Sequence, residues 1–341
     1  MEDILDRTYA AQQFFFQQIR DKLPPHISLV DEMEELLEIS QDSAYRRIRG
    51  EKELSFGEMQ KLVAHFGVSA DIAFNAASEN IVSFKYNPLN SHTFTMKDYI
   101  NSALDTVKGI SDKASCKMIY AAKDIPLFHY FIFDEIGAFK MFVWQKTLLG
   151  FPEFEHKYFS LASVDTELLT LGKKLLKEYN QFPSVELWNE ETINSILRQL
   201  EFYCEGRLFD DMLEAKIILD KIEEYVEHLR KQAESGHKIG IGPDQKKMGS
   251  FEMYNNEVFL SDNTILATSG DKKITFLTHN ALNFLTTTNN KFCDTTHEWF
   301  NNLIKRSSLI SSVSEKQRNQ FFSRIQLRIK QTRDKIKYMI D

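Results

Sequence analysis

SLVDEMEELLEISQDSAYRRIRGEKELSFGEMQKLVAHFGVS, residues 28–69, is the stretch that decides the fold of the N-terminal part of the chain. Its apolar residues recur every three or four positions in three short runs, which predicts three amphipathic helices. Ser28, Ser40 and Ser55 stand directly before these runs, where a serine hydroxyl caps the first free amides of a helix. Ser55 and Glu58 have the spacing of a capping box. The pattern therefore predicts a compact helical domain.

The middle helix, from about Gln41 to Arg49, carries the functional information. Ala44 and Ile48 are spaced to face the core, and Gly50 ends the helix as glycine commonly does. We also expect a further short helix to start at Ser69. The outward face of the middle helix is predicted to carry Gln41, Asp42, Tyr45, Arg46 and Arg49.

The residue types on this outward face suit contact with DNA. Glutamine pairs with adenine through two hydrogen bonds, and arginine pairs with guanine or with phosphate. Tyrosine contacts a phosphate or a thymine methyl group. The free amides at the start of a helix also favour a phosphate. A face that needed only to be hydrated would more commonly carry glutamate and lysine pairs.

Three short segments resemble the Cro/C1-type (phage-repressor-like, XRE) family of helix-turn-helix proteins: LLEISQ (36–41), GEK (50–52) and AHFGVS (64–69). The resemblance covers roughly residues 10–76 and implies a lambda-repressor-like DNA-binding domain in a bacterial transcription regulator. It implies that the start of the helix reads bases and that its end and the following loop hold phosphates. The predicted DNA-binding residues are Gln41, Asp42, Ser43, Tyr45, Arg46, Arg49 and Lys52.

The charge of the chain qualifies this prediction. The net charge is −7, and residues 1–80 contain fifteen acidic and eight basic residues. Four of those eight bases lie within residues 46–52, so the basic character is local. One such module makes few contacts, and useful affinity commonly needs two half-sites roughly 34 Å apart on DNA. We therefore expect a homodimer bound to double-stranded DNA.

The residues after the helix-turn-helix domain (1–79) are expected to be mainly helical at first. Helical periodicity runs through 97–111, 166–180, 190–205 and 211–234 and predicts an α-helical middle region, 80–234. The aromatic-rich segment 118–151 is expected to be core, and a ligand pocket is the less favoured interpretation. Residues 235–249, rich in glycine and lysine, are expected to be a linker.

A small α+β domain is expected for the last part of the chain, 250–341. Alternating segments at 250–260, 264–268 and 273–278 predict about three antiparallel strands, and helices are expected at 279–287, 295–306 and 312–338. The last helix has a heptad-like seam, which predicts packing on its own domain or, as alternatives, a dimer contact or an auxiliary phosphate-binding surface. The predicted fold class is mainly α. The seam consists of Phe322, Ile325, Ile329, Thr332, Ile336 and Met339.

Other classes of protein find little support. The first residues lack a signal peptide, the apolar stretch 128–151 is interrupted by charges, and the three cysteines form no CxxC pair. No catalytic, cofactor or metal motif is recognised, so we expect a cytoplasmic DNA-binding protein that is not an enzyme. Its effector is expected to be a small molecule or a peptide. The alternatives are an interaction adaptor that no longer binds DNA and a peptide-sensing regulator built from helical repeats.

Overall fold

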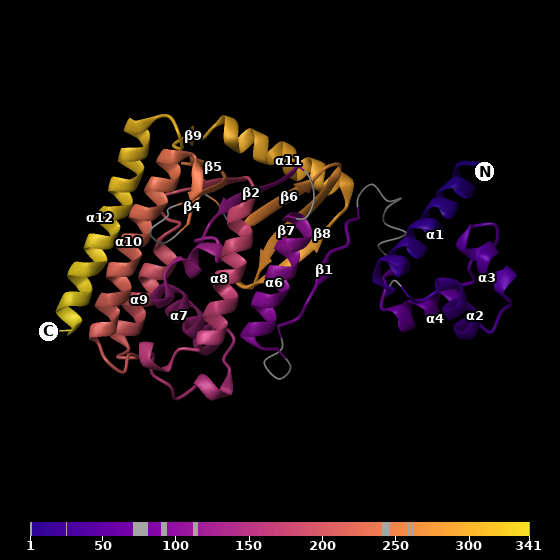
Figure 1. Cartoon of the computed structure of the whole chain (residues 1–341), viewed down its shortest axis with the longest axis horizontal. Helices are drawn as coiled ribbons and strands as arrows, with labels where there is room; N and C mark the ends of the chain where they lie inside the picture. Colours follow the sequence, from indigo (N-terminus) through magenta and orange to yellow (C-terminus); the bar gives the residue numbers. More distant parts are fainter. Residues whose placement is uncertain are drawn as a thin grey trace. The chain divides into compact units, whose positions relative to one another are not determined.

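The computed structural model describes residues 2–24, 26–70, 81–89, 94–111, 115–240, 246–257, 260 and 262–340. The chain divides into two compact units, residues 1–84 and residues 85–341, here called the N-terminal unit and the C-terminal unit (Figure 1). Each unit has hydrophobic core residues of its own. The two units are therefore described separately.

The N-terminal unit is helical and follows its local sequence signals. The hydroxyls of Ser28, Ser40 and Ser55 accept hydrogen bonds from amides in the first turn of the helix that each precedes, and Ser55 forms the predicted capping box with Glu58. Gly67 ends the last of these helices in the left-handed conformation. The helix expected from Ser69 falls mostly outside the described residues. The described helices are α1 (Glu2–Lys22), α2 (Leu29–Leu37), α3 (Gln41–Ile48) and α4 (Phe56–Phe66).

A single small core holds these helices together. Phe15, Phe16 and Ile19 of α1 are buried against Met33 of α2 and Leu62 of α4. The three α1 residues recur at helical spacing and supply most of the bulky apolar surface. The predicted inner residues of α3 are buried in the same core. Helix α1, for which the sequence gives no cap signal, is thus part of the core that α2, α3 and α4 share.

The C-terminal unit is built on one mixed sheet whose strands run in the order β1-β8-β7-β6-β2-β3-β5-β4, with β9 beside β5. The central strands β2, β3 and β5 are parallel, and the other pairs are antiparallel. The strands are β1 (Lys85–Tyr86), β2 (Cys116–Ala122), β3 (Ser184–Trp188), β4 (His237–Ile239), β5 (Lys247–Asn255), β6 (Thr264–Ser269), β7 (Lys272–His279), β8 (Asn283–Thr287) and β9 (Ser308–Leu309).

Helices cover both faces of this sheet (Figure 1). Helix α11 packs over one face, and the other α-helices, with the short helix η1, form the larger core on the opposite face. The helices are α6 (Met96–Ser111), η1 (Leu127–Ile132), α7 (Asp134–Val143), η2 (Trp144–Leu148), η3 (Pro152–Phe154), η4 (Leu161–Ser163), α8 (Thr166–Gln181), α9 (Asn194–Glu205), α10 (Leu213–Ser235), α11 (Asn290–Lys305) and α12 (Glu315–Ile340).

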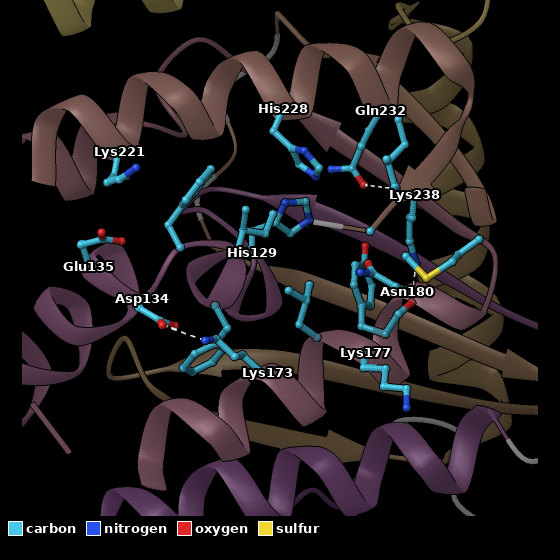
Figure 2. A pocket seen from close by; sticks show the side chains of 18 residues that line it. His129, Asp134, Glu135, Lys173, Lys177, Asn180, Lys221, His228, Gln232 and Lys238 are labelled. Carbon is cyan, nitrogen blue, oxygen red and sulfur yellow. Dashed lines mark hydrogen bonds and ion pairs between the residues drawn. The ribbon is translucent and has the colours of Figure 1, made fainter. Parts of the chain in front are cut away.

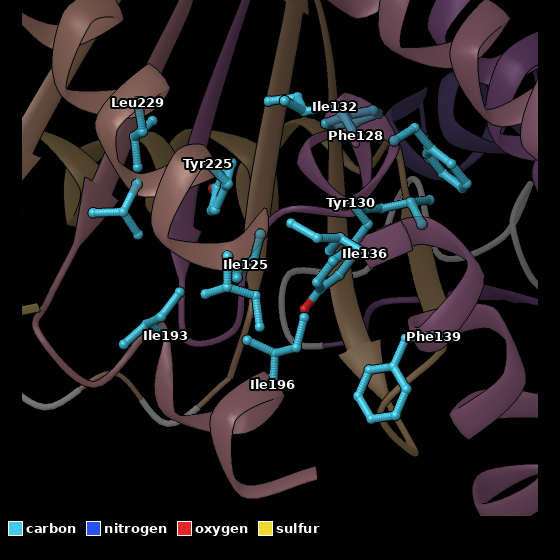
Figure 3. Close-up of a cluster of buried hydrophobic side chains, with 14 of the residues drawn as sticks. Ile125, Phe128, Tyr130, Ile132, Ile136, Phe139, Ile193, Ile196, Tyr225 and Leu229 are labelled. Atoms are coloured by element: carbon cyan, nitrogen blue, oxygen red, sulfur yellow. The ribbon is translucent and has the colours of Figure 1, made fainter. Parts of the chain in front are cut away.

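Alternation along β2 and β3 assigns their side chains to the two faces. Met118 and Tyr120 belong to the larger core, whereas Ile119 and Ala121 pack under α11. Figure 3 shows part of the larger core, where η1, α7, α9 and α10 supply most of the side chains. The expectation that segment 118–151 is core agrees with this packing, because most of its aromatic residues are buried.

The predicted fold class is wrong in its account of the sheet. The sheet has nine strands among the described residues, where about three antiparallel strands in a separate C-terminal domain were expected. Strands β2 and β3 come from the region expected to be helical, 80–234, and they pair with β5 and β6 from the region 250–341. Strands that are buried on both faces lack the polar alternation that marks a half-buried strand. The helices do not form repeats but cover this sheet.

Two further expectations in the last third of the chain are also wrong. The linker expected at 235–249 is largely replaced by β4 and the start of β5, and its residues 241–245 lie outside the described part. The segment 279–287 was expected to be a helix but contains strand β8. Strand β4 pairs antiparallel with β5, and β8 pairs along its length with β7. Pairing with a strand adjacent in the sequence thus decides both segments, and local propensity is a weak guide to such pairing.

The heptad-like seam of the last helix is buried inside the C-terminal unit. Helix α12 packs on α10 and α9 (Figure 1), and Phe322, Ile325 and Ile329 are at most 2% exposed. Arg333 on this helix forms ion pairs with Asp220 and Glu223 of α10. The seam therefore packs inside the C-terminal unit, on helices of the region 80–234 and not on the separate domain expected at 250–341, and it is not free for a dimer contact.

Candidate functional site

The exposed side of α3 carries most of the predicted DNA-binding residues. Gln41, Asp42, Tyr45, Arg46 and Arg49 are all exposed, while Ala44, Arg47 and Ile48 on the other side are buried. The exposed residues follow the spacing of one helical face, with Arg49 at the C-cap. We call the group Gln41, Asp42, Tyr45, Arg46 and Arg49 the α3 face.

Ser43 and Arg47 of α3 make contacts within the N-terminal unit and are not part of the α3 face. Ser43 is half-buried, and its hydroxyl accepts a hydrogen bond from the capping hydroxyl of Ser40 at 3.2 Å. Arg47, which belongs to the basic cluster, is 4% exposed and donates to Glu58 at 2.6 Å. This hydrogen bond is the largest influence on Glu58 and holds its pKa below the ordinary value. Arg47 therefore ties α3 to α4 and is not part of the exposed face.

Helix α1 fixes the end of α3 through two glutamines that the sequence did not single out. The Gln12 amide donates to the carbonyl oxygens of Arg47 and Lys52, both at 2.8 Å, and its oxygen accepts from the Leu54 amide at 3.1 Å. The Gln13 amide donates to the carbonyl oxygen of Ile48 at 2.8 Å. These bonds satisfy carbonyl groups that the end of a helix leaves free. They hold the exposed loop at Lys52 against α1.

Gly50 is required where α3 ends. Its φ angle is +81°, in the region that side chains other than glycine rarely adopt. A Cβ atom at this position would lie 2.4 Å from the ring of Tyr9 in α1. The glycine that was expected to end the helix thus also permits the close approach of α1.

The electrostatics of the α3 face are mixed. Arg46 and Arg49 lie 3.9 Å and 3.6 Å from the carboxylate of Glu51, and Arg49 also lies 5.6 Å from the centre of the Tyr45 ring. All of these side chains are exposed, so the ion pairs are weak and exchange readily with other partners. The arginines are free to turn toward a phosphate, with Glu51 as a local competitor.

The C-terminal unit contains a buried polar network around Glu186 of β3. This carboxylate is fully buried and accepts hydrogen bonds from His129 at 2.9 Å, from Trp188 at 2.7 Å and from the hydroxyl of Tyr179. Burial by itself would raise the pKa of Glu186, but His129 and the other donors bring it below its ordinary value. Tyr225 contacts the second ring nitrogen of His129 at 3.2 Å. The network joins β3 to η1, α8 and α10.

A second network surrounds Asp124, just after β2. Its carboxylate accepts from Tyr130 at 2.9 Å, from Ser195 at 3.1 Å and from Lys140 at 3.2 Å. Lys140 is fully buried, and burial lowers its pKa although Asp124 opposes this effect. Gln199 also accepts from the Lys140 ammonium at 3.1 Å. Tyr130, Lys140 and Ser195 are thus all bound within the cluster. We infer that the cluster holds the end of β2 against α7 and α9.

A polar cavity of about 620 Å³ lies beside the Glu186 network (Figure 2). Four lysines line it, and three of them, Lys173, Lys221 and Lys238, are bound to other groups of the protein. Lys173 is paired with Asp134 at 2.7 Å, and Lys221 is paired with Glu224 at 2.9 Å. Lys238 donates to the last carbonyl groups of α8, and burial lowers its pKa to about 7. The cavity therefore has no concentrated positive charge that would favour an anion.

The described residues provide neither a membrane span nor a metal site. No described helix has both the length and the apolar composition needed to cross a membrane. Within the described ranges, no three histidine, cysteine or acidic residues are grouped so as to hold a metal ion. Comparison of the chain with models of protein families, with curated proteins and with solved structures finds no match.

Proposed function

We propose that the chain is a sequence-specific DNA-binding transcription regulator whose α3 face enters the major groove. The observation that carries this proposal is the exposure of Gln41, Tyr45, Arg46 and Arg49 on one side of a capped helix. Gln12 and Gln13 of α1 hold the end of α3 in place. This supports the proposal, because a helix held in a fixed position can contact base edges at defined positions.

Within this proposal the residues have different tasks. Gln41 and Asp42, in the first turn of α3, contact base edges, and Tyr45 and Arg46 continue along the groove. Arg49 and Lys52 hold the phosphate backbone, and the half-buried Ser43 acts mainly through the cap. The acidic surroundings of the arginines keep the affinity of one module modest, which supports binding as a homodimer to two half-sites. The C-terminal unit then senses an effector.

Genomic-fragment selection with the purified full-length protein tests the proposal and yields the operator. On the selected DNA, Arg46→Ala and Gln41→Ala should each weaken binding by about 5- to 150-fold, the range for a lost base contact. Lys174→Ala removes one exposed positive charge from α8 of the C-terminal unit and serves as the charge-matched control. Unchanged binding by both α3 variants would overturn the assignment of the α3 face.

Salt dependence separates DNA binding from the adaptor alternative. Binding to DNA releases counterions, so the logarithm of the affinity must fall linearly with the logarithm of the salt concentration. Loss of one phosphate contact in Lys52→Ala should reduce that slope by about one. Failure to select any DNA above background, with the helical fold intact by circular dichroism, would favour an adaptor that binds protein.

A further inference from the structure

The C-terminal unit contains a second cavity, of about 460 Å³, whose walls are mainly apolar. One side is a single face of α6, on which Tyr99, Ala103, Val107 and Ile110 follow one another at helical spacing. The other side is the sheet, including Tyr120 of β2 and strands β6 to β8. The cavity therefore lies between α6 and the sheet, apart from the polar cavity of Figure 2.

The size of this space distinguishes it from ordinary packing. Protein cores are close-packed, and gaps much larger than a water molecule are few. An apolar cavity of roughly 150 Å³ already accepts benzene, and ligand sites commonly measure about 300–1,000 Å³. The cavity at α6 falls within the range of ligand sites. A small molecule fits it, whereas a folded segment of protein does not.

The hydroxyl of Tyr120 gives this apolar site one polar contact. Tyr120 is 3% exposed and lines the cavity, and its hydroxyl has no hydrogen-bond partner among the described residues. Buried tyrosine hydroxyls usually find a partner, so the hydroxyl of Tyr120 is left for a molecule in the cavity. The other buried tyrosines of the described C-terminal unit all have partners: Tyr130 with Asp124, Tyr179 with Glu186, Tyr203 with Thr147 and Tyr225 with His129.

We propose that this cavity binds a small, mainly apolar molecule carrying one hydrogen-bond acceptor, which receives the hydroxyl proton of Tyr120. Burial raises the pKa of Tyr120 well above its ordinary value, so the group stays protonated and acts as a donor. The exposed charge among the lining residues is confined to Lys85 and Asp98, and Asp98 is bound to Thr95 at the start of α6. A molecule with charge along its length does not suit these walls.

The cavity also touches the chain where it leaves the N-terminal unit. Lys85 and Leu89 line it, and Lys85 belongs to β1, a two-residue strand that pairs with β8 at the edge of the sheet. Both residues of β1 are exposed, so this pairing has little other packing to support it. A bound molecule adds contacts to this wall. Ligand binding is thereby expected to slow amide exchange at Lys85 and Tyr86.

The first test measures binding to the full-length protein by the fluorescence of N-phenyl-1-naphthylamine, which rises in an apolar site. Wild type should bind the dye saturably. Ala103→Trp, which fills the cavity from α6, should abolish binding, whereas Asn101→Trp on the exposed side of the same helix should leave it unchanged. No saturable binding to wild type, or equal binding by Ala103→Trp with an unchanged circular dichroism spectrum, overturns the site.

The second test concerns the hydroxyl and does not depend on filling the cavity. Acetophenone has a carbonyl acceptor that ethylbenzene, of similar shape, lacks. Wild type should prefer acetophenone in displacing the dye, and Tyr120→Phe should lose about 5- to 10-fold of that preference, the value of one hydrogen bond. Tyr158→Phe, on an exposed tyrosine, is the control. An undiminished preference in Tyr120→Phe overturns the assigned contact.

A regulatory role for the site rests on the proposed function, whereas ligand binding does not. On the selected DNA, saturating acetophenone should change the affinity of wild type and leave Ala103→Trp unaffected. Unchanged DNA affinity together with retained dye displacement overturns the regulatory role alone. Absence of DNA binding with retained displacement overturns the proposed function and leaves the ligand site standing.

Discussion

The two units use charged residues in different ways. In the N-terminal unit the arginines of the α3 face are exposed, and Arg47 with Glu58 forms its buried tie. In the C-terminal unit Glu186 and Lys140 are fully buried and held by partners far along the chain. Charged side chains are thus mainly exposed on α3 of the N-terminal unit, whereas those of the two networks in the C-terminal unit join elements of the fold.

Exposed and buried charges contribute differently to the stability of the fold. Exposed charges contribute about 0–1 kcal/mol each to stability, because water solvates them almost as well. A buried charge that loses its partners costs several kcal/mol. Substitutions in the N-terminal unit should therefore change binding more than stability, and substitutions in the C-terminal networks should do the reverse.

The largest effect is expected for Glu186→Ala. The change removes the shared acceptor of His129, Tyr179 and Trp188, while Tyr179 keeps the Ser184 hydroxyl as an acceptor at 3.1 Å. It should lower the free energy of unfolding by about 3–5 kcal/mol. The tryptophan fluorescence of urea unfolding measures this, because all three tryptophans lie in the C-terminal unit. Glu227→Ala, which removes an ion pair with Arg230 on the surface of α10, should cost under about 1 kcal/mol. Equal losses in the two variants would contradict the distinction between buried and exposed charge.

The pH dependence of stability offers a second contrast through Lys238, whose pKa burial lowers from 10.5 to about 7. Between these values the unfolded chain holds a proton on this residue that the folded chain lacks, so stability rises with pH in this window. The unfolding free energy of wild type minus that of Lys238→Met should rise by about 2 kcal/mol from pH 7.5 to pH 9. A constant difference across this window would show that the ammonium stays charged in the folded protein.

A smaller loss is expected for Gly50→Ala in the N-terminal unit. A left-handed backbone at an alanine and contact with Tyr9 should together cost about 1–2 kcal/mol. Hydrogen exchange in α3 measures this cost, because this unit has no tryptophan. Gly57→Ala is the control, since a Cβ there meets nothing within 4 Å. The same exchange rates in both variants would remove the role given to Gly50.

The smallest effect concerns the competitor on the α3 face. Glu51→Gln frees Arg46 and Arg49 and should raise DNA affinity about two- to fivefold at low salt, with a smaller gain at high salt. Glu53→Gln changes the net charge equally in the same loop but removes no described ion pair. A gain of the same size in both variants would assign the effect to net charge and not to Glu51.

The parts that the sequence predicts well are those with local causes. Serine caps, the capping box at Glu58 and the glycine ends depend on residues within one turn of each other, and the helices of the N-terminal unit follow them. Gln12 and Gln13 escaped notice because their partners are 35 to 42 residues away. Arg47 belongs to the basic cluster at 46–52, but its pairing with Glu58, eleven residues away, has no local sequence signal.

Alternation at 250–260, 264–268 and 273–278 predicts strands that correspond to β5, β6 and β7, but the central strands β2 and β3 and the single mixed sheet could not be predicted from such local signals. Strand β3 has the sequence SVELW, and all five of its residues are buried. Because neither face of this strand is exposed to solvent, its sequence lacks the alternation of apolar and polar residues that marks a half-buried strand. Glu186 in this strand resembles a surface residue until its donors, from η1 and α8, are brought together. The cavity at Tyr120 is lined by residues of five strands, β1, β2, β6, β7 and β8, and of the helices α6 and η1, and no single segment of the sequence contains it.

The pairing of elements far apart in the sequence sets the order in which the two units can fold during translation. The helices of α1 to α4 need only the first 84 residues, whereas β5 awaits its partner β9 and α10 awaits α12 at the end of the chain. At roughly 5–20 residues per second, translation of the remainder takes on the order of tens of seconds. A nascent chain therefore presents a finished α3 face well before the cavity beside α6 has all of its supporting fold.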